Sequence, residues 1–282
     1  MTMRTACLTL VAMLAFAANS LLCRLALKDG HIDAASFTAL RIGSGALVLA
    51  LIIHARGARP LAAGSWRSAW ALFVYAAGFS YAYLGLSAAT GALLLFGAVQ
   101  ATMLGYGLYA GERMARRQVA GLVIAAAGLI ALLLPGLAAP SLPHALLMAS
   151  AGMGWGIYSL RAKGAGDPAN ATAGNFLRAA PMALALALAW LPWSRIDGAG
   201  IAYALGSGAL ASGLGYVIWY QALRGLNATT AASVQLCVPV LATLGGALLL
   251  SEPLSGRLLY SAMAILGGLA LVTLKPTRPR QG

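Results

Sequence analysis

The chain has 282 residues, of which 61% are hydrophobic and only 9% are charged, and its mean hydropathy is +0.83. An ordinary soluble domain is about 45–50% apolar and about 25% charged, so the composition excludes a soluble enzyme or binding domain of this length. Nineteen Lys and Arg residues against six Asp and Glu residues give a formal net charge of +13. The basic residues fall between apolar runs and mostly on alternate connections, which is typical of cytoplasmic loops, so no nucleic-acid partner is expected.

Apolar runs of about 20 residues, the length that crosses a bilayer as a helix, recur along the whole chain. The connections between them are short and carry turn formers, as in Lys28-Asp29-Gly30. The pattern predicts an all-α integral membrane protein with ten transmembrane helices. The predicted spans are residues 5–27, 34–54, 68–87, 91–110, 118–135, 144–161, 173–192, 200–222, 229–250 and 258–274.

The distribution of basic residues predicts the orientation of these spans. If the N-terminus lies inside the cell, thirteen of the 19 basic residues fall on the cytoplasmic side, and only Arg24, Lys28, Arg195 and Arg257 fall on the opposite side. The remaining two lie within predicted spans. Because cytoplasmic loops carry an excess of Lys and Arg, both termini are predicted to lie in the cytoplasm.

The second half of the sequence repeats features of the first half. The Leu-Arg pair at Arg41 and the apolar run after it match the pair at Arg178, and the turn at Glu112 matches the turn at Glu252. Each half holds five spans, and an odd number of spans places the second copy upside down in the membrane. This inverted-repeat plan is that of many secondary transporters, which hold the substrate between the halves. The predicted repeats are residues 1–137 and 138–282.

Several short motifs occur at matching places in both halves. They are an aromatic-plus-small pair (Phe16-Ala17 and Trp155-Gly156), the Leu-Arg pair ending in Arg41 and Arg178, a Tyr-x-x-Leu motif (Tyr83 to Leu86 and Tyr220 to Leu223), Pro239, and the turns at Glu112 and Glu252. In these motifs the chain resembles, over nearly its whole length, the drug/metabolite transporter superfamily with two tandem EamA-type domains. The fourth span departs from the pattern, because it has Val99 where the ninth span has Pro239.

Within this superfamily the chain is most similar to the aromatic amino acid exporter branch. The resemblance implies ten helices, a bacterial-type inner-membrane location and outward movement of small metabolites. Small multidrug pumps of the same superfamily rely on a carboxylate within the first span, where this chain offers only Asn19. That departure counts against proton-coupled export of cations.

Polar and aromatic residues at helical spacing are the candidates for a substrate site. Tyr75, Phe79 and Tyr83 recur every four residues and therefore share one helix face. Amides in hydrocarbon need hydrogen-bond partners, so Gln100 and Gln235 either bridge helices or contact a polar ligand. The aromatic residues have packing, or an interface belt, as their alternative role. The predicted substrate-binding residues are Asn19, Tyr75, Phe79, Tyr83, Phe96, Gln100, Trp155, Tyr158, Tyr216, Tyr220 and Gln235.

Four ionisable residues in or beside the spans have two interpretations each. Arg41 and Arg178 lie about two turns from span ends, where a long side chain can snorkel to the interface. Anchoring or helix packing is therefore favoured for both over contact with a substrate carboxylate. Glu112 and Glu252 follow their spans close to basic neighbours, Arg113 and Arg257, and a turn-fixing interaction at the interface is favoured for them.

The backbone-breaking residues predict hinges. Gly206, Gly208 and Gly213 weaken the rigidity of the eighth span, and Pro181 and Pro239 interrupt hydrogen bonding in the seventh and ninth spans. Alternating access needs such hinges, although close helix packing also explains the glycines.

The sequence offers no paired carboxylates, metal-spaced histidines or nucleophile-and-base pair, so neither an enzyme activity, nor a cofactor, nor a metal is expected. The predicted function is a secondary transporter that exports amino acids, with aromatic amino acids among the candidates, or similar small metabolites. It is predicted to work by alternating access and to be driven by the substrate's own gradient. One alternative is an exporter of another metabolite or a drug-like cation. The other is a lipid scramblase or membrane scaffold, for which we expect a lipid-accessible polar groove in place of an enclosed cavity.

The predicted topology is testable with an introduced cysteine. The connection that contains Arg116 is expected to face the cytoplasm, because three arginines lie within it. A membrane-impermeant thiol reagent added to intact cells should therefore leave Arg116→Cys unlabelled until the cells are permeabilised. Strong labelling in intact cells would contradict the orientation.

Overall fold

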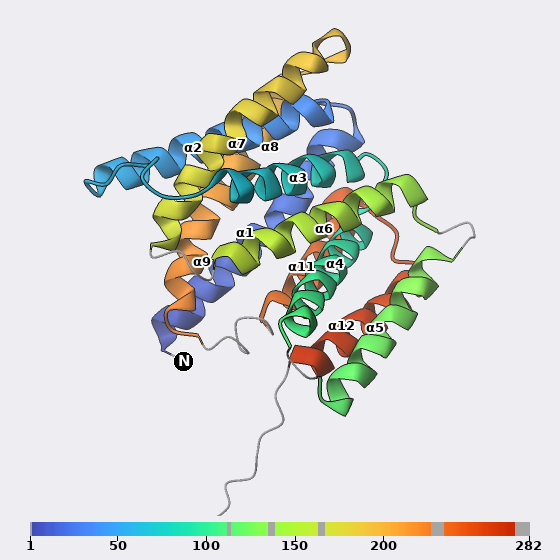
Figure 1. Ribbon diagram of the computed structural model, residues 1–282. Coiled ribbons are helices and arrows are strands. Elements are labelled where there is room, and N and C mark those ends of the chain that lie inside the picture. Colours follow the sequence, from blue (N-terminus) through green and yellow to red (C-terminus); the bar gives the residue numbers. More distant parts are fainter. Residues whose placement is uncertain (1, 112–113, 135–138, 163–166, 227–233, 274–282) are drawn as a thin grey trace, which may run out of the picture.

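The computed structural model of the chain describes residues 2–111, 114–134, 139–162, 167–226 and 234–273 (Figure 1). Within these ranges the chain is helical, apart from connections and one isolated bridge between Ile32 and Ile196. A short 3-10 helix, η1 (Leu191–Trp193), precedes the eighth segment. The helical segments are α1 (Met3–Lys28), α2 (Ala34–Ala55), α3 (Trp66–Ala82), α4 (Ala88–Tyr109), α5 (Arg116–Leu133), α6 (Leu142–Ala162), α7 (Pro168–Ala189), a continuous eighth segment of α8 (Gly198–Leu205), the π-helix η2 (Gly206–Leu214) and α9 (Gly215–Leu223), then α11 (Cys237–Leu250) and α12 (Gly256–Thr273).

Ten helical segments thus lie in the described part of the chain, and each overlaps one predicted span. The largest difference is at the ninth span, predicted from residue 229, because α11 begins at Cys237 and residues 227–233 lie outside the described residues. Six segments are long and apolar enough to cross a membrane, and α11 and most of α12 are shorter apolar helices. The all-helical, multi-pass membrane fold is confirmed.

Many helices begin at a residue whose side chain accepts a hydrogen bond from a first-turn backbone N–H, as N-caps do. Thr2, Ser65 and Ser87 cap α1, α3 and α4 in this way. The carboxylates of Asp33, Asp167 and Asp197 cap α2, α7 and α8. These three carboxylates therefore lie at the N-termini of helices.

The helices pack mainly in pairs that join the two predicted repeats. α1 lies against α9, α2 against α7 and η2, α3 against α6, and α4 against α6 and α11. α5 and α12 pack side by side at one edge of the bundle, where Figure 1 shows them together at the lower right. Neither predicted repeat buries its helices alone. The inverted relation between the repeats stays a prediction.

Glycines bring α5 and α12 into backbone contact. A Cβ added at Gly121 would lie 2.5 Å from the carbonyl oxygen of Gly268, and a Cβ added at Gly268 would meet the carbonyl oxygen of Gly121 and the backbone nitrogen of Ala125. Small residues at such a crossing let two membrane helices approach closely. The neighbouring Gly267, in contrast, faces open space.

Adjacent glycines on α12 give a matched test of this packing. Gly268→Ala should lower the unfolding temperature of the detergent-purified protein, because overpacking costs about 1–3 kcal/mol. Gly267→Ala should leave it unchanged or raise it, since Ala is favoured over Gly in a helix by about 1 kcal/mol. Equal unfolding temperatures for the two variants would show that α5 and α12 do not cross at this point.

Candidate functional site

A small cavity lies at the centre of the bundle, between α1, α3, α4, α6 and α9. Its volume is about 30 Å³, enough for about one or two water molecules. Most of its wall is aromatic, and polar side chains come from α1, α3 and the residues just before α11. The lining residues of this central cavity are Phe16, Asn19, Ser20, Tyr75, Phe79, Leu95, Phe96, Trp155, Tyr216 and Gln235.

Seven of the eleven predicted substrate-binding residues line the central cavity. They come from several helical segments of both halves, and they are Asn19, Tyr75, Phe79, Phe96, Trp155, Tyr216 and Gln235. The rings of Trp155 make close contacts across the cavity, with centroids 4.9 Å from Tyr75 and 5.2 Å from Tyr216. Whether these residues bind a substrate stays a prediction.

The other four predicted residues lie outside the cavity wall. Tyr83 is fully buried at the end of α3, where it packs edge-on against Phe79 at a centroid distance of 4.7 Å. Gln100 is half-buried on α4, beyond the lining residues. Tyr158 and Tyr220 belong to a neighbouring polar network, one helix turn or more from the cavity wall.

This polar network separates the central cavity from one end of the bundle. Tyr158 stacks on Trp155 and donates to the hydroxyl of Thr172, with 3.4 Å between the oxygens. Thr172 in turn donates to the hydroxyl of Tyr220 at 3.2 Å, and the Asn175 amide donates to the Tyr158 hydroxyl at 3.4 Å. These are long hydrogen bonds, and we call the four polar residues the inner network.

Two openings lie beyond the inner network, at the end of the bundle where α1 begins. The smaller one, about 350 Å³, is lined by Tyr158, Thr172 and Asn175 together with residues of the α2–α3 connection. The larger one, about 700 Å³, is lined by Tyr220 and by basic residues. Three arginines line the larger opening against one aspartate, and these residues are Arg4, Arg56, Arg224 and Asp167.

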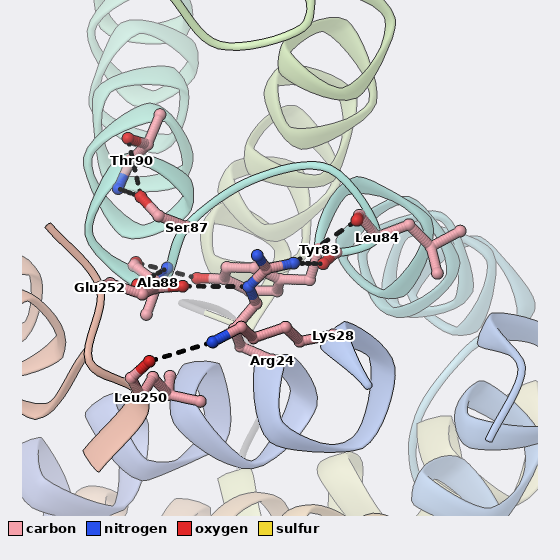
Figure 2. A network of polar contacts seen from close by, with 9 residues as sticks. All are labelled: Arg24, Lys28, Tyr83, Leu84, Ser87, Ala88, Thr90, Leu250 and Glu252. Atoms are coloured by element: carbon pink, nitrogen blue, oxygen red, sulfur yellow. Dashed lines mark hydrogen bonds and ion pairs between the residues drawn. The ribbon is translucent and has the colours of Figure 1, made fainter. Parts of the chain in front are cut away.

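The opposite end of the bundle is closed by an ion pair between the first and last thirds of the chain (Figure 2). Arg24 Nε on α1 lies 3.0 Å from Glu252 Oε1, in the connection between α11 and α12. The second carboxylate oxygen accepts from the backbone N–H of Ala88 at 2.8 Å, at the N-terminus of α4, where negative charge is favoured. Arg24 also donates to the Tyr83 carbonyl oxygen at 2.8 Å, and Lys28 donates to the Leu250 carbonyl oxygen at 3.0 Å.

We call the contact of Arg24 with Glu252 the outer ion pair, after the side on which the predicted topology places it, and it corrects the expected role of Glu252. The sequence suggested a local turn interaction near Arg257, whereas Glu252 is paired with Arg24, 228 residues away, and its side chain is only 8% exposed. Arg257 donates to the Leu134 carbonyl oxygen. Glu112, its predicted counterpart in the first repeat, lies outside the described residues.

A second electrostatic feature of this end lies in its loops. His31 Nδ1 is 2.8 Å from Asp197 Oδ2, so the α1–α2 connection and the start of α8 are joined. The hydrogen bond from the Gly200 backbone N–H, followed by that from His31, holds the pKa of the Asp197 carboxyl below its ordinary value. The carboxylate therefore stays ionised as the cap of α8.

The two arginines within the spans differ sharply. Arg178 behaves as a packing residue, because its guanidinium donates to the carbonyl oxygens of Ala63 at 2.8 Å and Leu61 at 3.2 Å in the α2–α3 connection. Arg41 was expected to anchor at the interface or to pack between helices, and its side chain, only 2% exposed, packs between helices and does not snorkel. Its guanidinium lies over the rings of Tyr75 and Phe79, two residues of the cavity wall.

The π-helix η2 supplies polar groups that the site prediction missed. Ser207 donates to Asn19 Oδ1 at 2.5 Å, and Ser212 accepts from Arg41 Nε at 3.4 Å. Residues five apart in an α-helix point about 140° apart, whereas the i→i+5 bonding of a π-helix stacks them on one side. The wider turn therefore brings both serines to the same cluster. The sequence signals for this cluster were the glycines of the span and the position of Ser212, four residues before Tyr216.

Comparison with known proteins identifies the family of this protein. Residues 142–274, within the second predicted repeat, match the model of the EamA-like transporter family. The uncharacterized protein PA1977 of Pseudomonas aeruginosa is 61% identical over 271 residues, which cover 95% of this chain and 94% of that protein. A protein known from a crystal structure has the same fold, with a TM-score of 0.68 and 22% identity over 95% of this chain and 96% of that one. The chain thus belongs to the EamA-like transporter family of the drug/metabolite transporter superfamily.

Proposed function

We propose that the protein is a secondary transporter that exports amino acids, aromatic ones among them, or similar small amphipathic metabolites across the bacterial-type inner membrane by alternating access. Family membership supports the coarse part of this proposal, a membrane transporter of small substrates. The central cavity carries the rest, because it combines an aromatic wall with a few polar groups between two separate closures. Both termini face the cytoplasm in this proposal, as the charge distribution predicts.

The cavity wall suits a substrate with an apolar side chain and polar head groups. Phe96, Trp155 and Tyr216 offer ring faces and edges against which an apolar group would be buried. Asn19 and Gln235 offer amides on the same wall, which would hydrogen-bond an amino or carboxylate group. Because the empty cavity holds only about one or two water molecules, the rings must move apart to admit a metabolite.

The two closures differ in strength, which supports alternating access. The outer ion pair of Arg24 and Glu252 is largely buried and links α1, α4 and the α11–α12 connection. The inner network consists of hydroxyl and amide hydrogen bonds of 3.2–3.4 Å, with wide openings beyond it. The protein therefore resembles a state that is sealed on the outer side and close to opening on the cytoplasmic side.

The positions of the carboxylates support transport that follows the substrate's gradient. A proton-driven carrier commonly uses an acid within the membrane whose protonation changes as the site switches sides. Among the described carboxylates, none lines the central cavity. Their positions are the end of α1 (Asp29), three helix N-caps (Asp33, Asp167 and Asp197) and the outer ion pair (Glu252).

The alternative functions receive less support. A scramblase needs a polar groove open to lipid, but the groove of about 430 Å³ between α4, α5 and α6 is lined almost wholly by Leu, Ala, Gly and Met side chains. A carrier of drug-like cations would bring a positive charge beside the buried guanidinium of Arg41. A cavity whose wall residues Tyr75 and Phe79 contact a buried positive charge favours a carrier of neutral, zwitterionic or acidic metabolites.

Two tryptophans give a matched test of the transport site. Trp155 lines the central cavity, whereas Trp70 is 57% exposed on the outer surface of α3. In proteoliposomes without an imposed pH gradient or membrane potential, the protein should exchange labelled amino acids across the bilayer. Trp155→Ala should raise the half-saturation concentration roughly tenfold or more, because burying a large apolar side chain contributes about 1.5–3 kcal/mol. Trp70→Ala should leave it unchanged.

Two outcomes would contradict this function. The first is that the wild-type protein exchanges none of the compounds in a panel of amino acids and aromatic metabolites. The second is that substrate accumulates against its gradient only when a proton gradient is imposed, and that this accumulation is lost in Glu252→Gln. That result would make the Glu252 carboxylate part of a proton relay.

The outer closure is testable through a native cysteine. Cys23 is fully buried one residue before Arg24, so a thiol reagent reaches it only when this end opens. In protein lacking the cysteines at positions 7 and 237, Glu252→Gln should accelerate labelling of Cys23 at least about tenfold, because breaking a buried ion pair costs about 3–5 kcal/mol. Lys28→Gln removes a charge from the same end without breaking the pair, and it should label like the parent. Equal rates for all three proteins would show that the ion pair does not hold this end closed.

A further inference from the structure

A charge lies at the centre of the bundle with no counter-ion among the described residues. The Arg41 side chain is 2% exposed, and its guanidinium carbon lies 5.0 Å from the ring centroid of Tyr75 and 4.8 Å from that of Phe79. Ring faces stabilise a cation, but only by about 0.5–2 kcal/mol, which is far less than the loss of hydration on burial. A buried charge is ordinarily paired, and an ionisable group inside a membrane protein points to function.

Four of the five described carboxylates are engaged elsewhere, and the fifth, Asp29, is exposed at the end of α1. Glu252 belongs to the outer ion pair with Arg24, and Asp33, Asp167 and Asp197 cap helices. Among the described residues, no hydrogen bond or ion pair joins a carboxylate to Arg41, whose polar partners are a phenol and a serine hydroxyl. Within the described part of the chain, the protein thus supplies the positive charge and leaves the negative one to another molecule.

The hydrogen bonds around Arg41 show the same imbalance, with more donors than acceptors. The Tyr75 hydroxyl accepts from Arg41 Nη2 at 2.8 Å and from Asn19 Nδ2 at 3.3 Å. A hydroxyl has two lone pairs and one proton, so its proton remains free to donate to something else. Arg41 Nη1 is buried and has no acceptor among the described residues. Buried donors normally have partners, so the group missing from this cluster is an acceptor.

The local backbone is built so that this cluster can form. A Cβ at Gly208 of η2 would collide with the Ser44 hydroxyl and the Arg41 carbonyl oxygen, so η2 and α2 touch at this level. The contact brings Ser212 to Arg41 Nε, and the π-helix brings Ser207 to Asn19 on the same side. π-turns inside α-helices occur frequently at functional sites. The donors around the cavity are therefore held in place by backbone packing.

The path from the cytoplasmic openings carries the same sign of charge. The larger opening is lined by Arg4, Arg56 and Arg224 against Asp167 alone. Clefts lined by one sign of charge raise the local concentration of ligands of the opposite sign. An anionic group would therefore be attracted first to the opening and then to the buried guanidinium.

We propose that Arg41, with the Tyr75 hydroxyl, forms the recognition site for a carboxylate or similar anionic oxygen group on the transported molecule. The inference rests on the proposed transport function and adds the substrate class. The ligand's oxygen atoms accept from Arg41 Nη1 and from the Tyr75 hydroxyl, and its apolar part lies against Trp155 and Tyr216. Charge-assisted hydrogen bonds of this kind are stronger than neutral ones and give a guanidinium its selectivity for carboxylates. The bound ligand thereby supplies the missing counter-ion.

Matched acids and amides test this substrate class. The probes are phenylacetate against phenylacetamide and L-phenylalanine against L-phenylalaninamide, because each amide keeps the shape of its acid and lacks the negative charge. Binding is measured as the ligand-dependent rise in unfolding temperature of the purified full-length protein, from which apparent dissociation constants follow. The wild-type protein should bind each acid at least about tenfold tighter than its amide.

Substitution of the two arginines connects the preference to one residue. Arg41→Gln should bind acid and amide within about threefold of each other. Arg178→Gln removes the arginine at the matching place of the second repeat, which bonds to loop carbonyls, and should keep the wild-type preference. If Arg41→Gln does not fold, Arg41→Lys decides, because it keeps the charge but loses the planar pair of donors. Arg41→Lys should weaken the preference at least about threefold.

Three results would overturn the inference. They are equal binding of acids and amides by the wild-type protein, an unchanged preference in Arg41→Gln or Arg41→Lys, and no stabilisation by any carboxylate in a panel of amino acids and aromatic acids. Failure of the transport function gives a different result. If the acids bind with the expected preference but are not exchanged across proteoliposome membranes, the anion site stands and the transport proposal fails.

Discussion

The arrangement of residues at the centre of this protein depends on a positive charge that is buried away from water and has no carboxylate partner among the described residues. The guanidinium of Arg41 needs ring faces and oxygen acceptors around it, and Tyr75, Phe79 and Ser212 provide part of that environment. These partners come from α3 and η2, so satisfying one charge on α2 determines how three helices meet. The central cavity adjoins this environment, because Tyr75 and Phe79 both contact the guanidinium and line the cavity.

Much of the fold could be predicted because lipid imposes a strong rule on the backbone. A spanning segment in lipid must satisfy its own hydrogen bonds, which forces long apolar helices that are legible in the sequence. The sequence also predicted which residues share a helix face. Tyr75 and Phe79, four residues apart, were predicted as site residues on this basis, and both line the cavity. The position of each residue along the helix axis relative to the cavity could not be predicted in the same way. Tyr83 continues the same stripe, yet it lies at the end of α3, beyond the cavity.

The charged residues were harder to predict because their roles depend on tertiary partners. Arg41 and Arg178 occupy matching places in the two halves, but one faces the bundle centre and the other faces loop carbonyls. Glu252 has a basic neighbour in sequence, yet its partner Arg24 comes from the first helix. The π-helix is a further case, since no hydrophobic pattern distinguishes Gly206–Leu214 from an α-helix. Only the packing of η2 against α2 explains Gly208, where a Cβ would collide with the Ser44 hydroxyl and the Arg41 carbonyl oxygen.

The cavity and the outer closure share two helices, and this connects ligand charge to conformation. On α1, Asn19 lines the cavity and Arg24, five residues later, makes the outer ion pair. On α3, Phe79 lies under Arg41, and the Tyr83 carbonyl oxygen accepts from Arg24. A ligand shifts a conformational equilibrium only through different affinities for the two states. An anion bound to Arg41 would shift the positions of the Tyr75 and Phe79 rings on α3. A movement of α3 would in turn displace the Tyr83 carbonyl oxygen that accepts a hydrogen bond from Arg24. The same two helices therefore give the bound ligand a physical means of favouring one closure over the other.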